Sequence, residues 1–315
     1  MIEPKIVIAG AGAFGTALAL TQCREGRDVT LVGRNSSVLK NGENPKLPGL
    51  PLPPNLAISD QLEVSSHDIL LMCIPMQQLT PYLSGRTINP GAVIACCKGI
   101  DLATGRGPTD ILRDHIDAPA TIPVGILTGP SFAADIGRGL PTALTLAMPH
   151  GASVQRALST DTLRLYLTDD VTGAEIGGAL KNVIAIACGI CIGAGFGESA
   201  RAALMTRGFT EMSRLALALG ARVETLAGLS GFGDLALTCT STQSRNFMFG
   251  HALGSGTTLP NTTVEGRATA HATANLAAKY GLEMPIAKAV ADVIDEKQTV
   301  QQALSDLLSR PLTKE

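Results

Sequence analysis

The chain has 315 residues, which is enough for two domains, because single cores stop growing at about 250 to 300 residues. Its 25 basic and 27 acidic residues leave a net charge of -2, so neither nucleic acid nor an anionic membrane is expected as its main partner. The 34 glycines and 3% aromatic residues favour an α/β protein of closely packed small aliphatic side chains.

The first predicted strand, "KIVIA" (5–9), leads into a glycine turn and then into a helical segment. Glycines stand at the three positions of a G-x-G-x-x-G dinucleotide-binding pattern. Gly10 would permit the turn, Gly12 would let the backbone approach a pyrophosphate, and Gly15 would let the helix pack on the strand. The helix N-terminus would supply positive partial charge to the phosphates. A glycine turn that binds no ligand is the alternative.

The second predicted strand, "DVTLVGR" (28–34), should end beside the adenosine ribose, where an acidic residue commonly selects NAD. This chain has Gly33, Arg34 and Asn35 there instead. Arg34 could pair with a 2′-phosphate, so we predict that NADP or NAD is accepted, with NADP slightly favoured. A solvated arginine at a strand end is the alternative.

Further apolar runs are predicted to be strands that are buried on both faces. Such strands indicate a parallel, doubly wound sheet. They cover residues 56–59, 68–75, 92–99, 124–132 and 142–148. Ligands bind at the carboxyl ends of the strands in such sheets. Pro75 and Met76, Lys98 and Gly99, and residues 129–132 stand at those ends. We expect Lys98 to point into the cofactor crevice, the alternative being a surface or capping lysine.

From about residue 172 the pattern becomes helical, over 174–193, 199–219 and 265–280. We therefore predict a dinucleotide-binding domain over 1–172 and a helical substrate domain over 173–315.

The stretch from Ile176 to Gly195 is apolar or small except for Lys181 and Asn182. A membrane span is disfavoured by this lysine, by the glycines and by the charged flanks. Lys181 either extends along its own stem to the surface or lines an active-site cleft. On the second interpretation Gly177 and Gly178, one turn earlier, leave space for nicotinamide or substrate.

Two segments, 228–246 and 254–266, are rich in glycine and polar residues and are expected to be loops. The first combines Asp234, several hydroxyls, Arg245 and Asn246. A guanidinium can bind a phosphate through two parallel hydrogen bonds, so this segment is a candidate phosphate site. A polar surface loop is the alternative.

The seven cysteines lie mostly in apolar runs, which is typical of reduced, buried thiols in a cytosolic protein. Cys188 and Cys191 form a C-x-x-C that we expect to serve helix packing. The histidines form no ligand cluster, so no metal site is expected. The strand pattern begins by Lys5, which leaves no room for a targeting peptide and predicts a cytoplasmic location.

Long motifs in a fixed order resemble NAD(P)-dependent glycerol-3-phosphate dehydrogenases over nearly the whole chain. They are "GAGAFGTALA" (10–19), "KG" (98–99), "TGPSFAADIGRGLPTA" (128–143), "GGALKNVIAIACGICIGAGFGESARAALMTRG" (177–208), "GFGDLALTCTSTQSRN" (231–246) and "VEGRATA" (264–270). The resemblance implies an N-terminal Rossmann-type domain followed by an all-helical domain. It also implies reversible hydride transfer between NAD(P)H and dihydroxyacetone phosphate, giving sn-glycerol 3-phosphate for glycerophospholipid synthesis. A homodimer remains open.

Carried over by position, the resemblance assigns proton transfer to Lys181, with Asn182 and Asp234 beside it. The implied substrate contacts are Lys98, Gly129, Ser131, Lys181, Asp234, Ser244, Arg245 and Asn246. The implied cofactor contacts are Gly10, Gly12, Ala13, Phe14, Gly15, Arg34, Lys98, Ala133, Arg245 and Glu265. Two departures concern the cofactor: Phe14 replaces the family's usual Trp, and "NPKLPG" (44–49) lacks the aromatic residue usual before Leu-Pro-Gly.

A lysine suits this chemistry because hydride arriving at a ketone carbon makes an alkoxide that needs a proton. Apolar surroundings would bring the lysine pKa near neutral if burial outweighs the attraction of Asp234. Two rival hypotheses are a related dehydrogenase of another β-substituted carbonyl, such as a 3-hydroxyacid, and a non-catalytic dinucleotide sensor.

Overall fold

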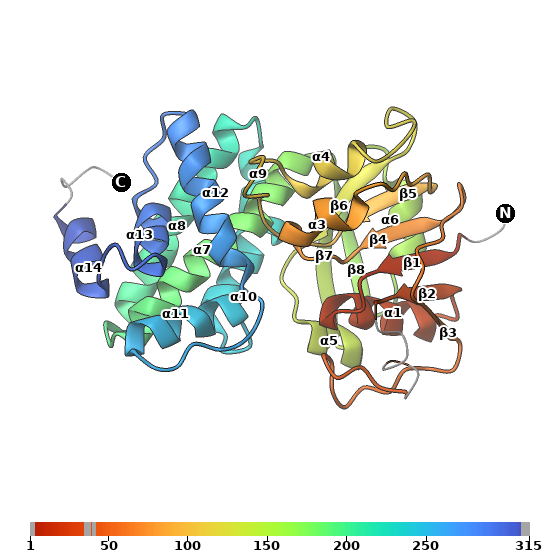
Figure 1. Ribbon diagram of the computed structural model, residues 1–315, viewed down its shortest axis with the longest axis horizontal. Coiled ribbons are helices and arrows are strands. Elements are labelled where there is room, and N and C mark those ends of the chain that lie inside the picture. The colour runs from red at the N-terminus through yellow and green to blue at the C-terminus, as the bar shows by residue number, and fades with distance from the viewer. Residues whose placement is uncertain (1–3, 35–38, 40–41, 310–315) are drawn as a thin grey trace.

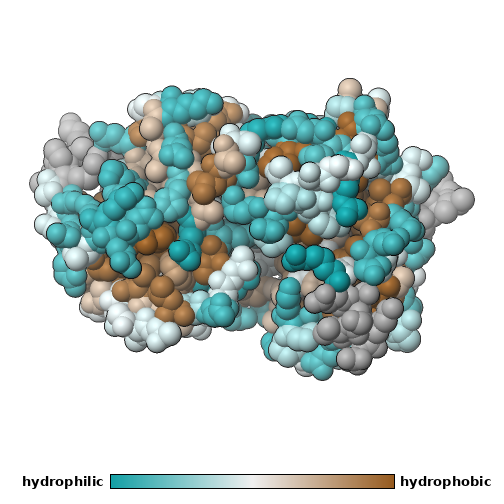
Figure 2. All heavy atoms as spheres, viewed as in Figure 1, coloured by the Kyte–Doolittle hydropathy of each residue, from teal (hydrophilic) through white to brown (hydrophobic). Residues whose placement is uncertain are grey.

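The computed structural model describes residues 4–34, 39 and 42–309. The described chain forms a sheet-containing lobe and a helical lobe that lie side by side, and α7 (Val171–Gly193) runs from their junction into the helical lobe (Figure 1). In the space-filling view a notch separates the lower parts of the two lobes (Figure 2).

Within the described residues the first lobe contains one eight-stranded sheet in the order β3-β2-β1-β4-β5-β6-β7-β8. Its strands are β1 (Ile6–Ala9), β2 (Val29–Val32), β3 (Leu56–Ser59), β4 (Ile69–Met72), β5 (Ala92–Ala95), β6 (Val124–Thr128), β7 (Thr142–Ala147) and β8 (Leu163–Thr168). Strand β1 is central and pairs in parallel with β2 and β4. The carboxyl ends of these strands therefore meet at one edge, where the glycine turn begins.

The prediction of a wholly parallel sheet is wrong at one point, because β7 runs antiparallel to β6. Strands that are covered on both faces have continuous apolar sequences in either direction, so this pattern does not report strand direction. Strand β8 was not predicted. Its buried Leu163 and Leu165 alternate with the exposed Arg164 and Tyr166, as expected for a strand with one covered face.

Helices cover both faces of the sheet, as a doubly wound fold requires. They are α1 (Ala13–Arg24), α3 (Met76–Leu83), α4 (Pro108–Arg113), α5 (Ala133–Arg138) and α6 (Ala152–Leu158). Alternate residues of β1 enter different cores: Ile6 and Ile8 join the α1 and α6 side, whereas Val7 and Ala9 join the α3 and α4 side. The predicted Rossmann-type lobe is confirmed.

The second lobe is all-helical, as predicted, and is built around α7. Its other elements are α8 (Gly197–Ala218), α9 (Val223–Ala227), the π-helix η1 (Leu229–Gly233), α10 (Asp234–Thr240), α11 (Arg245–Ser255), α12 (Glu265–Lys279), α13 (Pro285–Ile294) and α14 (Val300–Leu308). A Cβ atom on Gly189 would lie 2.0 Å from the carbonyl oxygen of Phe247. Glycine therefore lets the backbones of α7 and α11 pack in direct contact.

Helix α7 is the one helix in the described part of the chain that is long and apolar enough to span a membrane, with a hydropathy of 1.8. However, 89% of its most apolar window is buried inside the protein. It is the core of the helical lobe, and the other helices cover the surface that lipid would cover in a span.

The first of the two predicted loops is mostly helical, which corrects the prediction, whereas the second is mostly a loop, as predicted. Residues 228–246 contain η1, α10 and the start of α11, whereas in the segment 254–266 the connection between α11 and α12 covers 256–264. Glycine, serine and threonine have low intrinsic helix propensity, but packing overrides it here. Leu235 and Cys239, for example, are fully buried in the helical core.

Candidate active site

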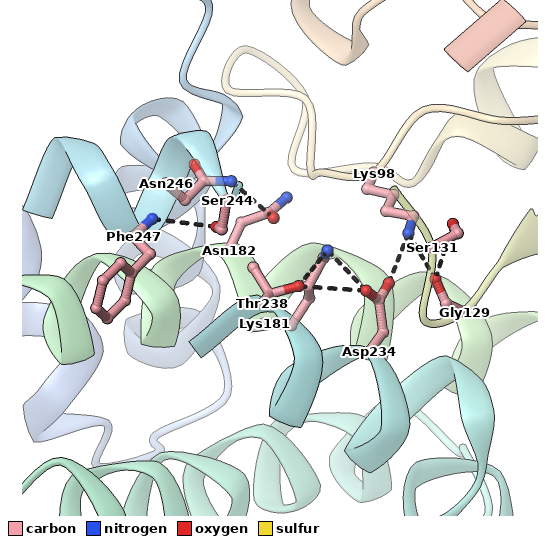
Figure 3. Close-up of polar contacts among 10 residues, drawn as sticks. All are labelled: Lys98, Gly129, Ser131, Lys181, Asn182, Asp234, Thr238, Ser244, Asn246 and Phe247. Atoms are coloured by element: carbon pink, nitrogen blue, oxygen red, sulfur yellow. Dashed lines mark hydrogen bonds and ion pairs between the residues drawn. The ribbon is translucent and has the colours of Figure 1, made fainter. Parts of the chain in front are cut away.

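One buried carboxylate holds two lysines at the junction of the lobes (Figure 3). Asp234, the first residue of α10, is 0% exposed, and its Oδ1 accepts a 2.8 Å hydrogen bond from Nζ of Lys181 on α7. Its Oδ2 accepts a 2.5 Å bond from Nζ of Lys98, which follows β5. Lys181 itself is only 7% exposed. It therefore lines the inter-lobe site, and the surface interpretation is wrong.

Burial outweighs the attraction of Asp234 in setting the pKa of Lys181. Burial lowers its pKa to about 8, against the opposing attraction of Asp234, and the nearby charge of Lys98 lowers it further. Burial acts to raise the pKa of Asp234, but the two lysines outweigh it and lower the pKa. Two ammonium groups around one carboxylate leave a net positive charge, which suits a developing alkoxide.

Thr238 completes the environment of Lys181, and the sequence analysis did not assign it to the site. Its Oγ1 accepts a 2.7 Å bond from Lys181 Nζ and donates to Asp234 Oδ1 at 3.3 Å. Thr238 lies four residues after Asp234, so both side chains project from one face of α10. That spacing could have identified it once α10 was recognised as a helix.

Lys98 is also tied to the loop that follows β6. Its Nζ donates to the carbonyl oxygen of Gly129 at 3.2 Å, and Ser131 Oγ donates to the same oxygen at 3.3 Å. The structure thus brings Lys98, Gly129 and Ser131 together beside Asp234 (Figure 3).

Asn182 and Asn246 connect three helices beside the lysines. Asn246 Nδ2 donates to Asn182 Oδ1 at 2.9 Å, and Asn246 Oδ1 accepts from the Gly266 N–H at 3.0 Å. Ser244 caps α11, since its Oγ accepts from the Phe247 N–H at 3.2 Å. These polar side chains therefore hold α7, α11 and α12 in fixed relative positions.

Arg245 is the exposed first residue of α11. Its positive charge interacts with Glu265, the first residue of α12. Burial raises the pKa of the Glu265 carboxyl, and the charge of Arg245 acts to lower it. Glu265 also accepts a 3.4 Å hydrogen bond from the backbone N–H of Met76 at the start of α3. Arg245 and Glu265 thus lie together, and Glu265 contacts the sheet lobe directly.

The glycine turn between β1 and α1 has a geometry that fits a pyrophosphate. Gly10 has φ +117°, and a Cβ there would lie 2.4 Å from the Cys73 carbonyl oxygen. A Cβ on Gly15 would lie 2.1 Å from the Gly10 oxygen. Gly12 has no neighbouring atom within 4 Å of its Cβ position, and the first turn of α1 carries no acidic residue. Gly12 therefore has open space beside it and lies at the N-terminus of α1, where the electrostatic potential is positive.

The other predicted cofactor residues surround this turn. Ala13 and Phe14 in α1 and Ala133 in α5 pack against one small apolar cluster. Arg34 is exposed just after β2. Asn35 lies outside the described residues.

The prediction that Gly177 and Gly178 leave space for a ligand is wrong. A Cβ on Gly177 would lie 2.6 Å from the carbonyl oxygen of Ser230 in η1. One on Gly178 would lie 2.8 Å from Oγ1 of Thr128 at the end of β6. Protein atoms fill both spaces, so these glycines admit neighbouring elements to α7.

The cysteines agree with the prediction of free thiols. All seven are free and six of them are buried, including Cys188 and Cys191 within α7. Among residues 4–34, 39 and 42–309, no three histidine, cysteine or acidic side chains form a group that could hold a metal ion.

Known proteins match this chain over nearly its whole length. Residues 5–154 match the family model of the NAD-dependent glycerol-3-phosphate dehydrogenase N-terminus, and residues 170–305 match that of its C-terminus. The chain is 54% identical to a glycerol-3-phosphate dehydrogenase [NAD(P)+] of Paracoccus denitrificans, over 98% of this chain and 99% of that protein. The corresponding protein of Cereibacter sphaeroides is 55% identical, over 98% and 100% of the two chains.

The fold agrees with these matches. The crystal structure of glycerol-3-phosphate dehydrogenase from Coxiella burnetii superimposes with a TM-score of 0.89 at 34% identity, covering 98% of this chain and 99% of that one. The chain therefore belongs to the NAD-dependent glycerol-3-phosphate dehydrogenase family.

Proposed function

We propose that this protein transfers hydride reversibly between NAD(P)H and dihydroxyacetone phosphate, with Lys181 carrying the proton at the substrate oxygen. Family membership makes the protein an oxidoreductase that uses NAD or NADP. The observation that carries the proposal is the buried Lys181, whose pKa is lowered to about 8 between Asp234 and Lys98. The names of the close relatives support glycerol 3-phosphate as the reduced product.

The chain's own groups perform the proton transfer. The bound nicotinamide supplies the hydride. In the reducing direction the Lys181 ammonium donates a proton to the substrate oxygen as negative charge develops there, and in reverse the neutral amine accepts it. A pKa of about 8 gives both forms near neutral pH. Asp234 holds the amine in place, and Lys98 adds positive charge beside the developing alkoxide.

The phosphate is proposed to bind at the N-terminus of α11. Arg245 is exposed at the first position of this 11-residue helix, where backbone N–H groups and the helix dipole favour an anion. Its guanidinium can donate two parallel hydrogen bonds to a phosphate. Ser244 and Asn246 support the site by fixing the start of the helix.

The cofactor is proposed to lie along the glycine turn and the start of α1. Gly10, Gly12 and Gly15 shape the turn, Ala13, Phe14 and Ala133 line it, and Glu265 and Arg245 close it from the helical lobe. Arg34 at the end of β2 favours NADP slightly over NAD.

Three further proposals concern the whole protein. The domain division at 172/173 is supported by the start of α7 at Val171. A cytoplasmic location and a role in glycerophospholipid precursor supply are proposed from the family resemblance, and assembly as a homodimer can be tested by light scattering.

The proposal is tested by supplying purified protein with dihydroxyacetone phosphate and either NADH or NADPH. Consumption of at least one coenzyme is expected, and consumption of neither would refute the proposal.

Arg245→Ala should raise the KM for dihydroxyacetone phosphate by about 10-fold or more, because a charge-assisted contact is lost. Turnover of unphosphorylated dihydroxyacetone should change little in this variant. An equal loss with both substrates would contradict the phosphate role.

A further inference from the structure

The segment 42–52 folds against the proposed cofactor site. It closes on itself through a hydrogen bond from the Leu52 N–H to the Gly42 oxygen at 2.8 Å and a bridge between Glu43 and Pro51. Within it, Asn44 is 2% exposed, although asparagine is a residue type found mostly at the surface.

The side chain of Asn44 has all its principal hydrogen bonds inside the protein. Its Nδ2 donates to the carbonyl oxygen of Ala11 at 3.2 Å and to Oγ1 of Thr16 at 2.6 Å. Its Oδ1 accepts from the Lys46 N–H at 2.9 Å. Ala11 lies in the glycine turn and Thr16 in the first part of α1, so one buried amide joins the distant segment to both.

Holding the Ala11 carbonyl also orients the next N–H group. The peptide that joins Ala11 to Gly12 is trans, since the described chain contains no cis peptide bond. In a trans peptide the C=O and the N–H point in opposite directions. The bond from Asn44 therefore turns the Gly12 N–H away from segment 42–52, and Gly12 is the residue with open space around its Cβ position.

Apolar side chains of the same segment pack against α1 and α5, the two helices that flank the proposed cofactor site. Leu47 joins Ala17 and Leu20 of α1 and Ile136 of α5 in a small core. A Cβ on Gly137 of α5 would lie 2.6 Å from Leu50 and 3.2 Å from Leu47, so that glycine admits the segment. Ala13, Phe14 and Ala133, which the proposed function assigns to the cofactor, pack on this core.

We propose that Asn44 is a positioning residue that holds the glycine turn in its binding conformation before the dinucleotide arrives. The inference rests on the proposed cofactor role of that turn. Preorganisation strengthens binding because the ordering cost is met during folding and not at binding. Asn44 touches neither substrate nor reacting atoms in this account, so its removal should weaken cofactor binding without slowing the chemical step.

The test measures NADPH binding to the full-length protein by fluorescence titration, together with steady-state kinetics. Asn44→Ala should raise the Kd and the KM for NADPH about 10-fold or more, which corresponds to ~1.4 kcal/mol or more. The kcat at saturating NADPH and the KM for dihydroxyacetone phosphate should stay within about threefold. If Asn44→Ala does not fold, Asn44→Leu keeps a similar size and lacks the donor to Ala11 without adding a charge.

Two matched variants separate positioning from general stability. Gln22→Ala removes another buried amide on α1, whose Nε2 donates to the Leu158 oxygen at 2.8 Å, well along the helix from the glycine turn. It should lower Tm but leave the NADPH Kd unchanged. Thr16→Val removes the hydroxyl that accepts a hydrogen bond from Asn44 but leaves the bond from Asn44 to Ala11. The NADPH Kd of this variant should therefore stay within about threefold of the wild-type value.

The outcomes also distinguish this proposal from the proposed function. If the wild-type protein binds NADPH and Asn44→Ala binds it equally well, the positioning role is wrong and the dehydrogenase assignment stands. If Gln22→Ala weakens binding as much as Asn44→Ala, the effect is one of stability and the positioning role is again wrong. If the wild type binds NADPH but does not reduce dihydroxyacetone phosphate, the assignment fails while the binding comparison still decides the role of Asn44.

Discussion

At the scale of single residues, the reactivity of Lys181 is set by opposing effects, of which burial is the largest. Burial favours the neutral amine, whereas Asp234 favours the ammonium, and the balance leaves the pKa at about 8. The hydroxyl of Thr238 accepts a hydrogen bond from the same nitrogen at 2.7 Å. Removal of any one partner should therefore move the pH at which the lysine loses its proton.

Thr238→Val tests this balance. The variant loses an acceptor that favours the ammonium, so the pKa of Lys181 should fall. In a profile of kcat against pH for the reducing direction, the midpoint of the alkaline limb should move to lower pH by about 0.5 to 1 unit. Thr240→Val is the matched control, because the exposed Thr240 hydroxyl donates to the Ala236 carbonyl on the same helix and lies outside the lysine site. Identical profiles for the two variants would contradict the role of Thr238.

Sequence reasoning succeeded best for residues whose placement depends on neighbours in the chain. The glycine turn could be predicted because its three glycines act through local backbone geometry. The buried position of Lys181 could be predicted because a lysine inside an apolar helix indicates a special environment for its charge. Asn44 could not, because Ala11 and Thr16 come from another segment of the chain and no local pattern marks it. Thr238 could have been found from its spacing to Asp234 only once α10 was recognised as a helix.

At the scale of elements, the π-helix η1 controls where Asp234 lies. It ends at Gly233, directly before Asp234, and its backbone packs against α7 at Gly177. A Cβ on Gly231 would lie 2.0 Å from the Leu226 oxygen, so this turn tolerates little change. π-Helices are rare and occur often at functional sites.

Gly177→Ala should therefore displace η1 and, with it, Asp234. We expect kcat to fall about 10-fold or more while the NADPH Kd stays unchanged, since a 1 Å misplacement of catalytic groups has large effects on rate. Gly208→Ala is a useful control, because it crowds the Ile184 side chain in the same core without touching η1. Equal loss of kcat in both variants would show that general destabilisation, and not the position of η1, causes the effect.

The same elements show why the expectation of loops at 228–246 failed. Glycine and hydroxyl residues disfavour helices on local grounds, yet η1 and α10 are helical because their buried faces pack on α7. Glycines inside α7 were likewise interpreted as ligand space, although only the folded structure shows that η1 and the end of β6 occupy it. Periodicity and composition report neither kind of long-range packing.

At the scale of the whole molecule, a few partly buried polar contacts join the two lobes. Lys98 bonds Asp234, Glu265 bonds the Met76 N–H, and Glu175 of α7 accepts from the Thr109 N–H of α4 at 2.8 Å. Burial raises the pKa of Glu175 to about 7, against the hydrogen bonds from Thr109. This contact should make the stability of the joined lobes depend on pH.

The direction of that dependence follows from proton binding. Between the ordinary pKa of 4.5 and about 7, the folded protein binds more protons at Glu175 than the unfolded chain does. Glu175 therefore stabilises the fold less as pH rises through this window. Between pH 5 and 7 the Tm of the wild type should fall more steeply than that of Glu175→Gln, measured by calorimetry. Parallel curves for the two proteins would contradict a Glu175 whose pKa is raised in the folded protein.

The central claim is that the proton in the reaction passes through Lys181, and the pH dependence of kcat tests it most directly. For dihydroxyacetone phosphate reduction at saturating NADPH, the wild-type kcat should fall as pH rises above about 8, as the ammonium is lost. In Lys181→Ala, kcat should be lower by about 100-fold or more, the alkaline limb should vanish, and the NADPH Kd should be nearly unchanged. A Lys181→Ala enzyme that kept most of its kcat, or that showed the same alkaline limb, would contradict the account.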